Sequence, residues 1–121
     1  MKSCLLVDDS KTIRNVVRGM LASLRFEVSE AADGAEALAA CERSLPEVVI
    51  LDWNMPVMNG LDFLKALRAK PGGGAPIVIF CTTENSLEHI QEGLAAGANE
   101  YIMKPFDKNI LQDKLAQVGA L

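Results

Sequence analysis

The stretch Val48-Val49-Ile50-Leu51-Asp52 decides the fold, because four consecutive apolar residues lead directly into a carboxylate. Short runs with almost no polar residue are typical of strands that are buried on both faces of a parallel sheet. Four further segments are strand-like in length, at residues 4–7, 28–31, 77–81 and 100–103. The sequence therefore predicts five strands, of which 48–51 is the third.

Segments with helical spacing separate these strands. In the clearest one, residues 13–24, apolar side chains recur at steps of three and four, as expected for the buried stripe of an amphipathic helix. Its members are Ile13, Val16, Val17, Met20, Leu21 and Leu24. Weaker stripes follow at 38–45, 63–67, 87–94 and 111–118. Because strands alternate with helices, the predicted fold class is α/β, a doubly wound parallel sheet in a three-layer sandwich.

The size and charge of the chain restrict what the protein does. With 121 residues, 50% hydrophobic and 23% charged, it fits one domain over residues 1–121 with no output domain. The net charge of -4 disfavours a nucleic-acid-binding surface, which normally carries a basic patch. No apolar run approaches the ~20 residues of a membrane span, and the N-terminus lacks the features of a signal peptide. We therefore expect a soluble, cytoplasmic protein whose partners include neither nucleic acid nor membrane.

The cysteines and the single histidine are interpreted as structural residues. Cys4, Cys41 and Cys81 are an odd number without metal-binding spacing, and each lies in an apolar stretch, which favours reduced thiols in the core. His89 lies on the opposite side of the predicted helix 87–94 from the apolar stripe of that helix. We expect its side chain to face solvent.

Polar side chains follow the predicted strands at the points where the strands end. In doubly wound sheets, the ligand site lies beyond the carboxyl ends of the strands, at a switch in strand order. The side chains expected there are Asp8 and Asp9 after the first strand, Asp52 after the third, Thr82 and Thr83 after the fourth, and Lys104 after the fifth. The sequence therefore predicts one site at this edge of the sheet.

The three acids predict a metal site, since carboxylates in one place repel one another unless a cation neutralises them. Mg²⁺ suits such a site, because it prefers oxygen ligands, retains several waters and accepts phosphate oxygens in its remaining positions. No cluster of His or Cys accompanies Asp8, Asp9 and Asp52 in the sequence, which argues against zinc. We expect Mg²⁺ as the cofactor.

Asp52 is the best-placed nucleophile, because its backbone continues a buried strand while its side chain reaches the edge. A carboxylate can attack phosphorus and form an aspartyl phosphate. A phosphoryl group carries negative charge during transfer, and a second cation besides Mg²⁺ stabilises it; Lys104 supplies that cation. A cis Lys104-Pro105 bond could aim the Lys104 side chain at the site, although trans is the commoner state of X-Pro bonds. The Thr82 hydroxyl and the Thr83 backbone N–H are further donors for the phosphoryl oxygens.

Each of these pieces also has an ordinary structural interpretation when it is taken alone. Asp8-Asp9 is then a loop or helix cap, Thr82-Thr83 the start of a helix, and 104–106 a surface loop. These interpretations do not account for the joint placement of the pieces at strand ends.

The combination resembles the receiver domains of two-component systems, and among them the stand-alone, CheY-like type. The matching stretches occur in order over nearly the whole chain, at residues 5–10, 51–56, 82–84, 97–101 and 104–106, with Gly60 after the second. The resemblance implies five parallel strands in the order 2-1-3-4-5 with five helices, the flavodoxin-like arrangement of which CheY is a known example.

The resemblance also implies roles for individual residues. Asp52 would accept a phosphoryl group from a histidine kinase or a histidine phosphotransfer protein. Asp8, Asp9, Asp52 and the backbone carbonyl of Asn54 would hold Mg²⁺. Lys104 would contact the phosphoryl group.

A conformational switch is a further implication of the resemblance. Thr82 would move toward the phosphate, Tyr101 would turn inward, and a surface for a downstream protein target would change its affinity. Asn54 and Glu84 occupy positions that influence how fast the phosphate is lost, and Trp53 would report binding by fluorescence. The protein would be a signalling switch that catalyses only its own phosphorylation and slow dephosphorylation, as a monomer or as a phosphorylation-dependent dimer.

Two other functions fit the predicted fold less well. A Mg²⁺-dependent phosphatase commonly has a second acid two residues after its nucleophile, where this chain has Asn54. A flavin carrier is suggested by the fold alone, and the acidic loop at residues 8–12 would repel the flavin phosphate. Within the signalling interpretation, the residues do not decide between a motor switch and a phosphate sink or relay.

Overall fold

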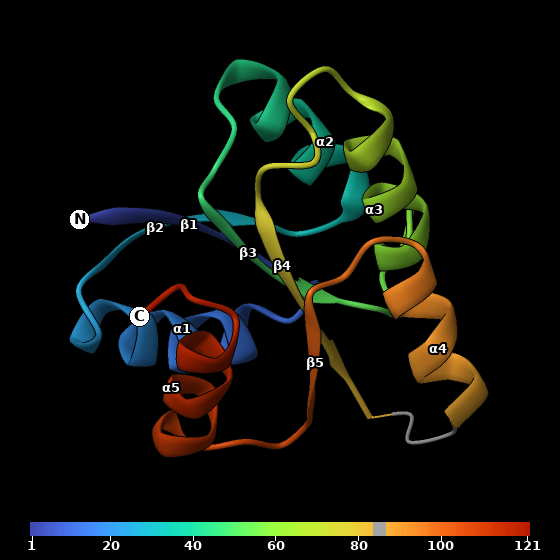
Figure 1. Ribbon diagram of the computed structural model, residues 1–121. Coiled ribbons are helices and arrows are strands. Elements are labelled where there is room, and N and C mark those ends of the chain that lie inside the picture. Colours follow the sequence, from blue (N-terminus) through green and yellow to red (C-terminus); the bar gives the residue numbers. More distant parts are fainter. Residues whose placement is uncertain (84–86) are drawn as a thin grey trace.

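The computed structural model describes residues 1–83 and 87–121, in which a parallel sheet lies between two layers of helices (Figure 1). The strands are β1 Lys2–Val7, β2 Phe26–Ala31, β3 Val48–Asp52, β4 Ile77–Thr82 and β5 Glu100–Met103. The helices are α1 Lys11–Ser23, α2 Gly34–Arg43, α3 Gly60–Ala69, α4 Leu87–Ala95 and α5 Lys108–Gln117. The strand order is β2-β1-β3-β4-β5 and each pair is parallel, so the predicted α/β fold and strand order are confirmed.

The register of the central strands brings their carboxyl ends level with one another. Val7 of β1 pairs with Leu51 of β3, and Asp52 pairs with Cys81 of β4. All of β3 and the last four residues of β1 are buried, because helices cover both faces of the sheet. Asp8 follows Val7 directly and therefore stands level with Asp52.

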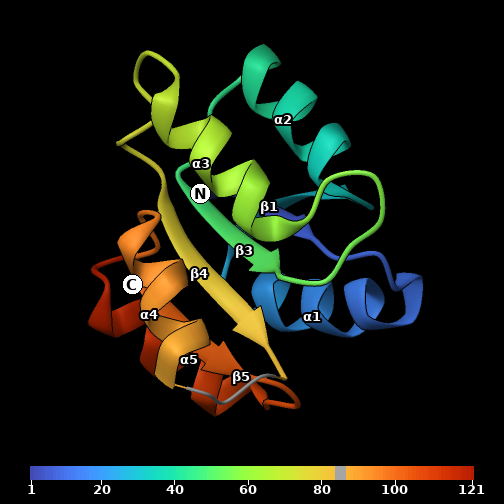
Figure 2. The ribbon, with the colours of Figure 1, turned by 90° about the vertical axis from the view of Figure 1, so that its right-hand side faces the viewer.

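Apolar clusters on the two faces of the sheet hold the helices in place. One cluster joins strand side chains to Val17 and Leu21 of α1 and to Leu111 and Leu115 of α5. In the other, side chains of α2 and α3 pack on the sheet, and α4 covers the same face (Figure 2). Each fully buried Leu stabilises the fold by roughly 1.5–3 kcal/mol. The two layers therefore leave the carboxyl edge of the sheet as the place where polar side chains gather.

The apolar stripe of α1 is less buried than the sequence predicted. Val17 and Leu21 are buried, but Ile13 and Val16 are 38% and 54% exposed. The first turns of α1 extend past the carboxyl end of β1, where these two side chains line a groove beside Phe106 instead of packing on the sheet. The periodic pattern was correct, but only its second half meets the core.

The cysteines are buried with free thiols, as predicted. Burial raises the pKa of the Cys4 thiol to about 12, and it also raises the pKa of Cys41 and of Cys81. Thiols of this kind stay protonated and are poor nucleophiles. They contribute to packing rather than to chemistry.

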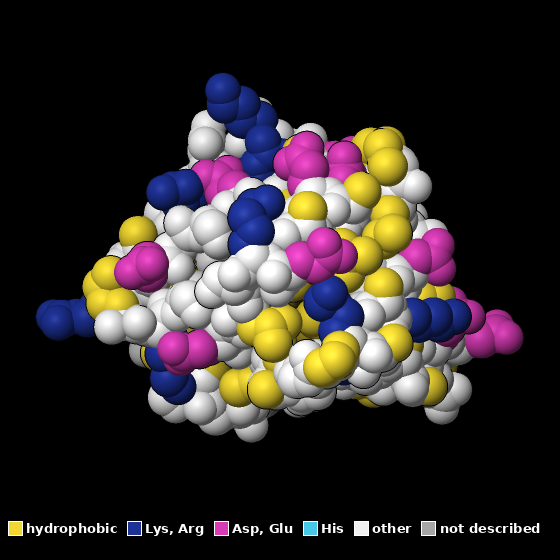
Figure 3. All heavy atoms as spheres, turned by 90° about the horizontal axis from the view of Figure 1, so that it is seen from above, with side chains coloured by type: hydrophobic (Ala, Val, Ile, Leu, Met, Phe, Trp, Pro, Cys, Tyr) yellow, Lys and Arg dark blue, Asp and Glu magenta, His cyan; other side chains and the backbone are white. Residues whose placement is uncertain are grey.

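The surface carries charges of both signs. Figure 3 views the molecule from the side of the α2–β3 and α3–β4 connections, where Lys and Arg side chains are interspersed with Asp and Glu. Among the described residues, no helix combines the length and the apolar character that crossing a lipid bilayer requires.

Candidate functional site

Acidic side chains meet at the carboxyl edge of the sheet. Asp8, Asp9 and Asp52 each offer a carboxylate oxygen, and these oxygens all lie within 4.8 Å of one another. Asp8 and Asp52 are 4% and 8% exposed, whereas Asp9 is exposed. The sheet creates this proximity, because β1 and β3 are hydrogen-bonded neighbours.

Lys104 reaches the acidic cluster from the end of β5. Its Nζ lies 2.8 Å from Asp8 Oδ2 and 3.0 Å from Asp52 Oδ1, so one ammonium group binds two carboxylates. The Lys104 backbone N–H donates to the Thr82 carbonyl at 2.9 Å, which attaches the lysine to the end of β4. The Lys104–Pro105 peptide bond is cis, one of the two forms that the sequence left open.

Asp8 is held from two sides. The Ser10 backbone N–H donates to Asp8 Oδ1 at 2.9 Å, while Lys104 donates to Oδ2. The Ser10 side chain also caps α1, since it accepts a hydrogen bond from the Ile13 N–H. The start of α1 therefore orients an acidic side chain of the site.

The site carries an excess of negative charge. Burial raises the pKa of Asp52, Lys104 lowers it and the neighbouring Asp8 and Asp9 raise it again, so that the net direction is upward. Burial lowers the pKa of Lys104, but its bonds to Asp8 and Asp52 outweigh that effect and the pKa rises. Three carboxylates and one lysine leave two negative charges, which a divalent cation would neutralise.

The donor set fits Mg²⁺. The cluster of Asp8, Asp9 and Asp52 consists of carboxylates alone, the ligand type that Mg²⁺ prefers. Asn54 lies two residues beyond Asp52 and is exposed, and its carbonyl stays a predicted ligand. Glu84, for which the sequence predicts an influence on phosphate loss, lies outside the described residues.

Gly60 shapes the site in a way that the sequence analysis did not identify. A Cβ at this position would lie 2.2 Å from the Asp52 carbonyl oxygen and 2.8 Å from the Phe80 ring. The Gly60 N–H donates to the Trp53 carbonyl at 2.9 Å. Only glycine lets α3 begin this close to the end of β3, and an Asn-Gly pair such as Asn59-Gly60 is a sequence signal for a turn of this kind.

Thr82 and Thr83 lie at the end of β4, where the sequence placed them. Thr82 is buried and forms the last residue of the strand, and Thr83 follows it with an exposed side chain. Because Asp52 pairs with Cys81, the residue just before Thr82, both threonines belong to the same edge as the acids. Their roles toward a phosphoryl group stay predictions.

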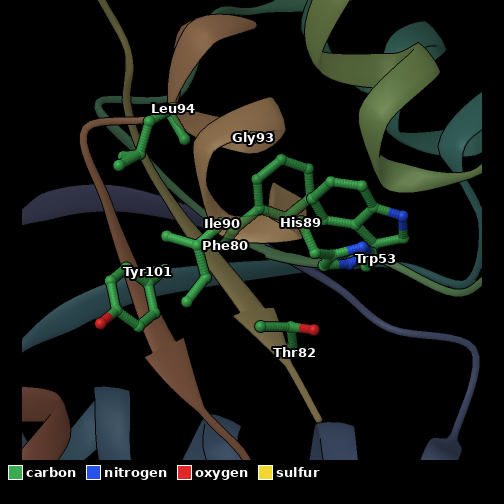
Figure 4. A pocket seen from close by; sticks show the side chains of 9 residues that line it. Trp53, Phe80, Thr82, His89, Ile90, Gly93, Leu94 and Tyr101 are labelled. Carbon is green, nitrogen blue, oxygen red and sulfur yellow. The ribbon is translucent and has the colours of Figure 1, made fainter. Parts of the chain in front are cut away.

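Tyr101 borders a small cavity rather than the acidic cluster. The residue is half-buried on β5, and Lys114 Nζ lies 4.9 Å from the centre of its ring. The cavity is lined by Trp53, Thr82 and His89 as well as Tyr101, and its volume is about 10 Å³ (Figure 4). That volume holds a single water molecule at most, so a tyrosine ring enters only if the lining moves.

His89 does not face solvent, contrary to the prediction. Its ring lies on Trp53, with 3.6 Å between the ring centroids. Leu87 and Leu94, which belong to the predicted buried stripe of this helix, are 69% and 41% exposed. The helix is rotated so that His89 and Gly93, four residues apart, face the sheet, because the glycine lets the backbone approach closely.

The fold and the site together define a class of protein, a doubly wound α/β domain with a lysine-bridged acidic site where the strand order reverses. Comparison with known protein families agrees with this class. The response regulator receiver domain family matches residues 4–116. The chain belongs to the response regulator receiver family.

Chemotaxis proteins are among its relatives. Chemotaxis protein CheY1 of Helicobacter pylori (strain J99) is 41% identical over 116 residues, which cover 94% of each chain. CheY-3 of Vibrio cholerae is 40% identical over 115 residues, covering 94% of this chain and 88% of that protein. The solved structure of the chemotaxis response regulator CheY4 of Vibrio cholerae is 42% identical, with a TM-score of 0.92 over 98% of both chains.

A further solved structure bears on the metal. The receiver domain of a sensor histidine kinase from Pseudomonas aeruginosa contains a magnesium ion coordinated in its active-site cleft. It is 33% identical to this chain, with a TM-score of 0.88 over 98% of both chains. At the level of the family, the chain is a phosphorelay switch homologous to CheY response regulators, which work with histidine kinases and downstream targets.

Proposed function

We propose that this chain is a single-domain response regulator of a two-component or chemotaxis-type phosphorelay, and that Asp52 is its phosphorylated residue. One observation carries the proposal: Lys104 bonds both Asp8 and Asp52 at 2.8 and 3.0 Å, with Asp9 beside them. The donor is a histidine kinase or a histidine phosphotransfer protein. The protein acts in the cytoplasm and signals by binding a protein target, not nucleic acid or membrane.

Asp52 acts as the nucleophile. One of its carboxylate oxygens forms the new bond to phosphorus while the P–N bond of the donor phosphohistidine breaks, and the imidazole nitrogen keeps the electron pair. Asp8, Asp9, Asp52 and the Asn54 carbonyl would hold Mg²⁺, which supplies positive charge next to the phosphoryl oxygens. The buried strand end keeps the Asp52 backbone in place while this happens.

Lys104 changes partners as the reaction proceeds. In the unphosphorylated protein, its ammonium group bonds Asp8 and Asp52. A phosphoryl group on Asp52 offers new charged oxygens to the same ammonium group, and charge-assisted bonds of this kind are strong. The Thr82 hydroxyl and the Thr83 backbone N–H supply further donors. The phosphoryl group thereby favours an arrangement with Thr82 drawn toward it, which makes room for Tyr101.

Intact-mass measurement tests the phosphorylation step. After incubation with Mg²⁺ and acetyl phosphate or a cognate kinase, we expect the parent protein to gain one phosphoryl group. Asp52→Asn should gain none, because an amide oxygen is a poor nucleophile. Asp62→Asn, which changes an exposed acid on α3, should behave like the parent. An unchanged mass of the parent with both donors would contradict the proposal.

The output is tested by partner capture. A motor switch should retain its target protein only when a stable phosphate mimic occupies Asp52. A phosphate sink should instead drain the kinase without gaining a target. Size-exclusion chromatography with and without the mimic decides between a monomer and a phosphorylation-dependent dimer.

A further inference from the structure

Trp53 connects the acidic site to α4. It follows Asp52 directly and is only 8% exposed. Its ring contacts two aromatic neighbours, Phe80 of β4 with 4.6 Å between ring centroids and His89 of α4 with 3.6 Å. Figure 4 shows the Trp53 and His89 rings close together, with Tyr101 well apart from them on β5. A displacement of the Trp53 ring therefore meets α4 at His89 and at Gly93.

His89 is one of the few residues of α4 that are even half-buried. Within α4, whose residues are all described, Gly93 alone is buried. A Cβ at Gly93 would lie 3.1 Å from both the Trp53 ring and the Phe80 ring, so the helix backbone already sits close to them. A helix with few buried side chains has a low local stability, and each contact is a large share of what holds it. The stack of His89 on Trp53 is one such side-chain contact, and Ile90, which is also half-buried, lines the neighbouring cavity.

The same cavity joins this stack to the proposed switch residues. Trp53 and His89 line it together with Thr82 and Tyr101, and its volume of about 10 Å³ is too small for a tyrosine ring. Tyr101 therefore turns inward only if Thr82 or α4 moves. Any movement of α4 away from the sheet has to separate His89 from Trp53.

We propose that His89 is a positioning residue whose stack on Trp53 makes the position of α4 depend on the state of Asp52. The inference rests on the proposed function, since it takes Asp52 as the site that changes state. A phosphoryl group on Asp52 adds bulk and charge beside the next residue, Trp53, and displaces the Trp53 ring. His89 passes that displacement to α4 and so sets the space open to Tyr101. This route adds to the one through Thr82.

A purely structural role for His89 predicts a different behaviour. If the ring only filled space, its removal would speed hydrogen exchange of α4 by the same factor in both states of Asp52. The response of α4 to phosphorylation would then stay as large as in the parent. The two interpretations are therefore separated by the size of the response, not by stability alone.

Hydrogen exchange of residues 87–95 measures that response, with and without Mg²⁺ and acetyl phosphate. In the unphosphorylated state, His89→Ala should speed α4 exchange by about twofold to tenfold, the factor expected for the loss of one aromatic pair. Alanine is a better helix former than histidine, so propensity alone would act in the opposite direction. Phosphorylation should then change α4 exchange by a correspondingly smaller factor than in the parent. His89→Phe should restore both values.

Gln91→Ala is the matched control, because Gln91 is exposed on the same helix. It should leave both values as in the parent, and it should leave Trp53 emission unchanged, whereas His89→Ala should shift that emission. Intact mass, measured on the same samples, should show equal phosphorylation in all variants, since His89 contacts Trp53 rather than the reacting carboxylate.

Two results would overturn the inference. One is equal α4 exchange in the unphosphorylated parent and His89→Ala proteins. The other is a His89→Ala protein whose α4 responds to phosphorylation as fully as the parent does. If the parent takes up no phosphoryl group, the proposed function fails and this inference fails with it. If the parent is phosphorylated and either of the two results above is found, only the inference fails.

Discussion

Two positively charged side chains bind oxygen atoms at opposite ends of the same sheet, and these oxygen atoms differ in charge. At the carboxyl edge, Lys104 bonds the charged carboxylates of Asp8 and Asp52. At the amino edge, Arg68 of α3 donates to neutral oxygens at 2.8 to 3.1 Å. These are the carbonyls of Gly73, Pro76 and Gly97 and the side-chain oxygen of Asn99.

The difference separates a permanent connection from an exchangeable one. The Arg68 guanidinium joins the end of α3 to the segments just before β4 and β5, and its acceptors are neutral groups that do not titrate. Burial lowers the pKa of Arg68, yet a guanidinium stays charged in proteins. The acceptors of Lys104 are carboxylates that a metal ion or a phosphoryl group can take over. One end of the sheet is thus held together while the other can change state.

The largest expected effect is on phosphotransfer, from Lys104→Met. Loss of the charged donor should slow phosphorylation of Asp52 by roughly 10²–10³-fold, as for the removal of one transition-state donor. Mg²⁺ should bind more tightly, because the ammonium group no longer competes for Asp8 and Asp52. Acetyl phosphate kinetics and Mg²⁺ titration of Trp53 fluorescence measure both effects. Lys108→Met, at an exposed lysine of α5, is the control, and a parent-like rate in Lys104→Met would refute this expectation.

The second effect is on stability, from Arg68→Met. The change leaves several partly buried carbonyl oxygens without their donor, which should lower the free energy of unfolding by about 3 kcal/mol. The Arg68→Met protein should still be phosphorylated on Asp52. Urea unfolding with and without Mg²⁺ sharpens the comparison: Mg²⁺ should restore stability lost in Lys104→Met, but not that lost in Arg68→Met. A full rescue of Arg68→Met by Mg²⁺ would show that the two ends are not separate.

The third effect is a pH dependence at the carboxyl edge in metal-free protein. Burial raises the pKa of Asp52 above 3.8, so the folded protein keeps a proton that the unfolded chain releases. The contribution of Asp52 to the free energy of unfolding should therefore fall as pH rises from 3.8 through the raised pKa. Urea unfolding in EDTA across this range, with Asp52→Asn as reference, isolates the contribution. A difference that grows with pH in favour of the parent would contradict the sign.

The smallest effect concerns backbone strain. At the amino edge, Gly72 and Gly97 are left-handed, with φ of 76° and 116°, and so is Arg25 just before β2, with φ of 69°. At the carboxyl edge, Val57 between β3 and α3 has φ of 68° and a side chain that is 84% exposed. A β-branched residue is strained there, so Val57→Asn should raise the free energy of unfolding by about 1 kcal/mol. Chemical unfolding in the presence of Mg²⁺ measures the gain, and a loss of stability would contradict the claim that Val57 is strained.

Much of the fold could be predicted because its signals are local. The apolar run that ends in Asp52 marks both a buried strand and the side chain at its end, and Ser10 marks the start of α1. The rotation of α4 could not be predicted from the same kind of signal. Its leucines match a helical period, but the close approach at Gly93 turns His89 toward Trp53 instead.

The contacts of Arg68 could not be predicted from the sequence either. A lone arginine on a helix is usually a solvated residue, and its acceptors belong to two loops that come together only when β4 and β5 are in place. The exposure of Ile13 has a similar origin, since it depends on how far α1 extends past β1.

Sequence alone determined which residues end the strands, because strand length, helical period and the acids that follow an apolar run are written in consecutive positions. Tertiary structure decided which of those residues touch. Lys104 and Asp8 are 96 positions apart, and they are 2.8 Å from each other because β1 and β5 share one parallel sheet. Tertiary structure also decided what lies on Trp53, since helix rotation depends on packing across the sheet and not on the period of the helix itself.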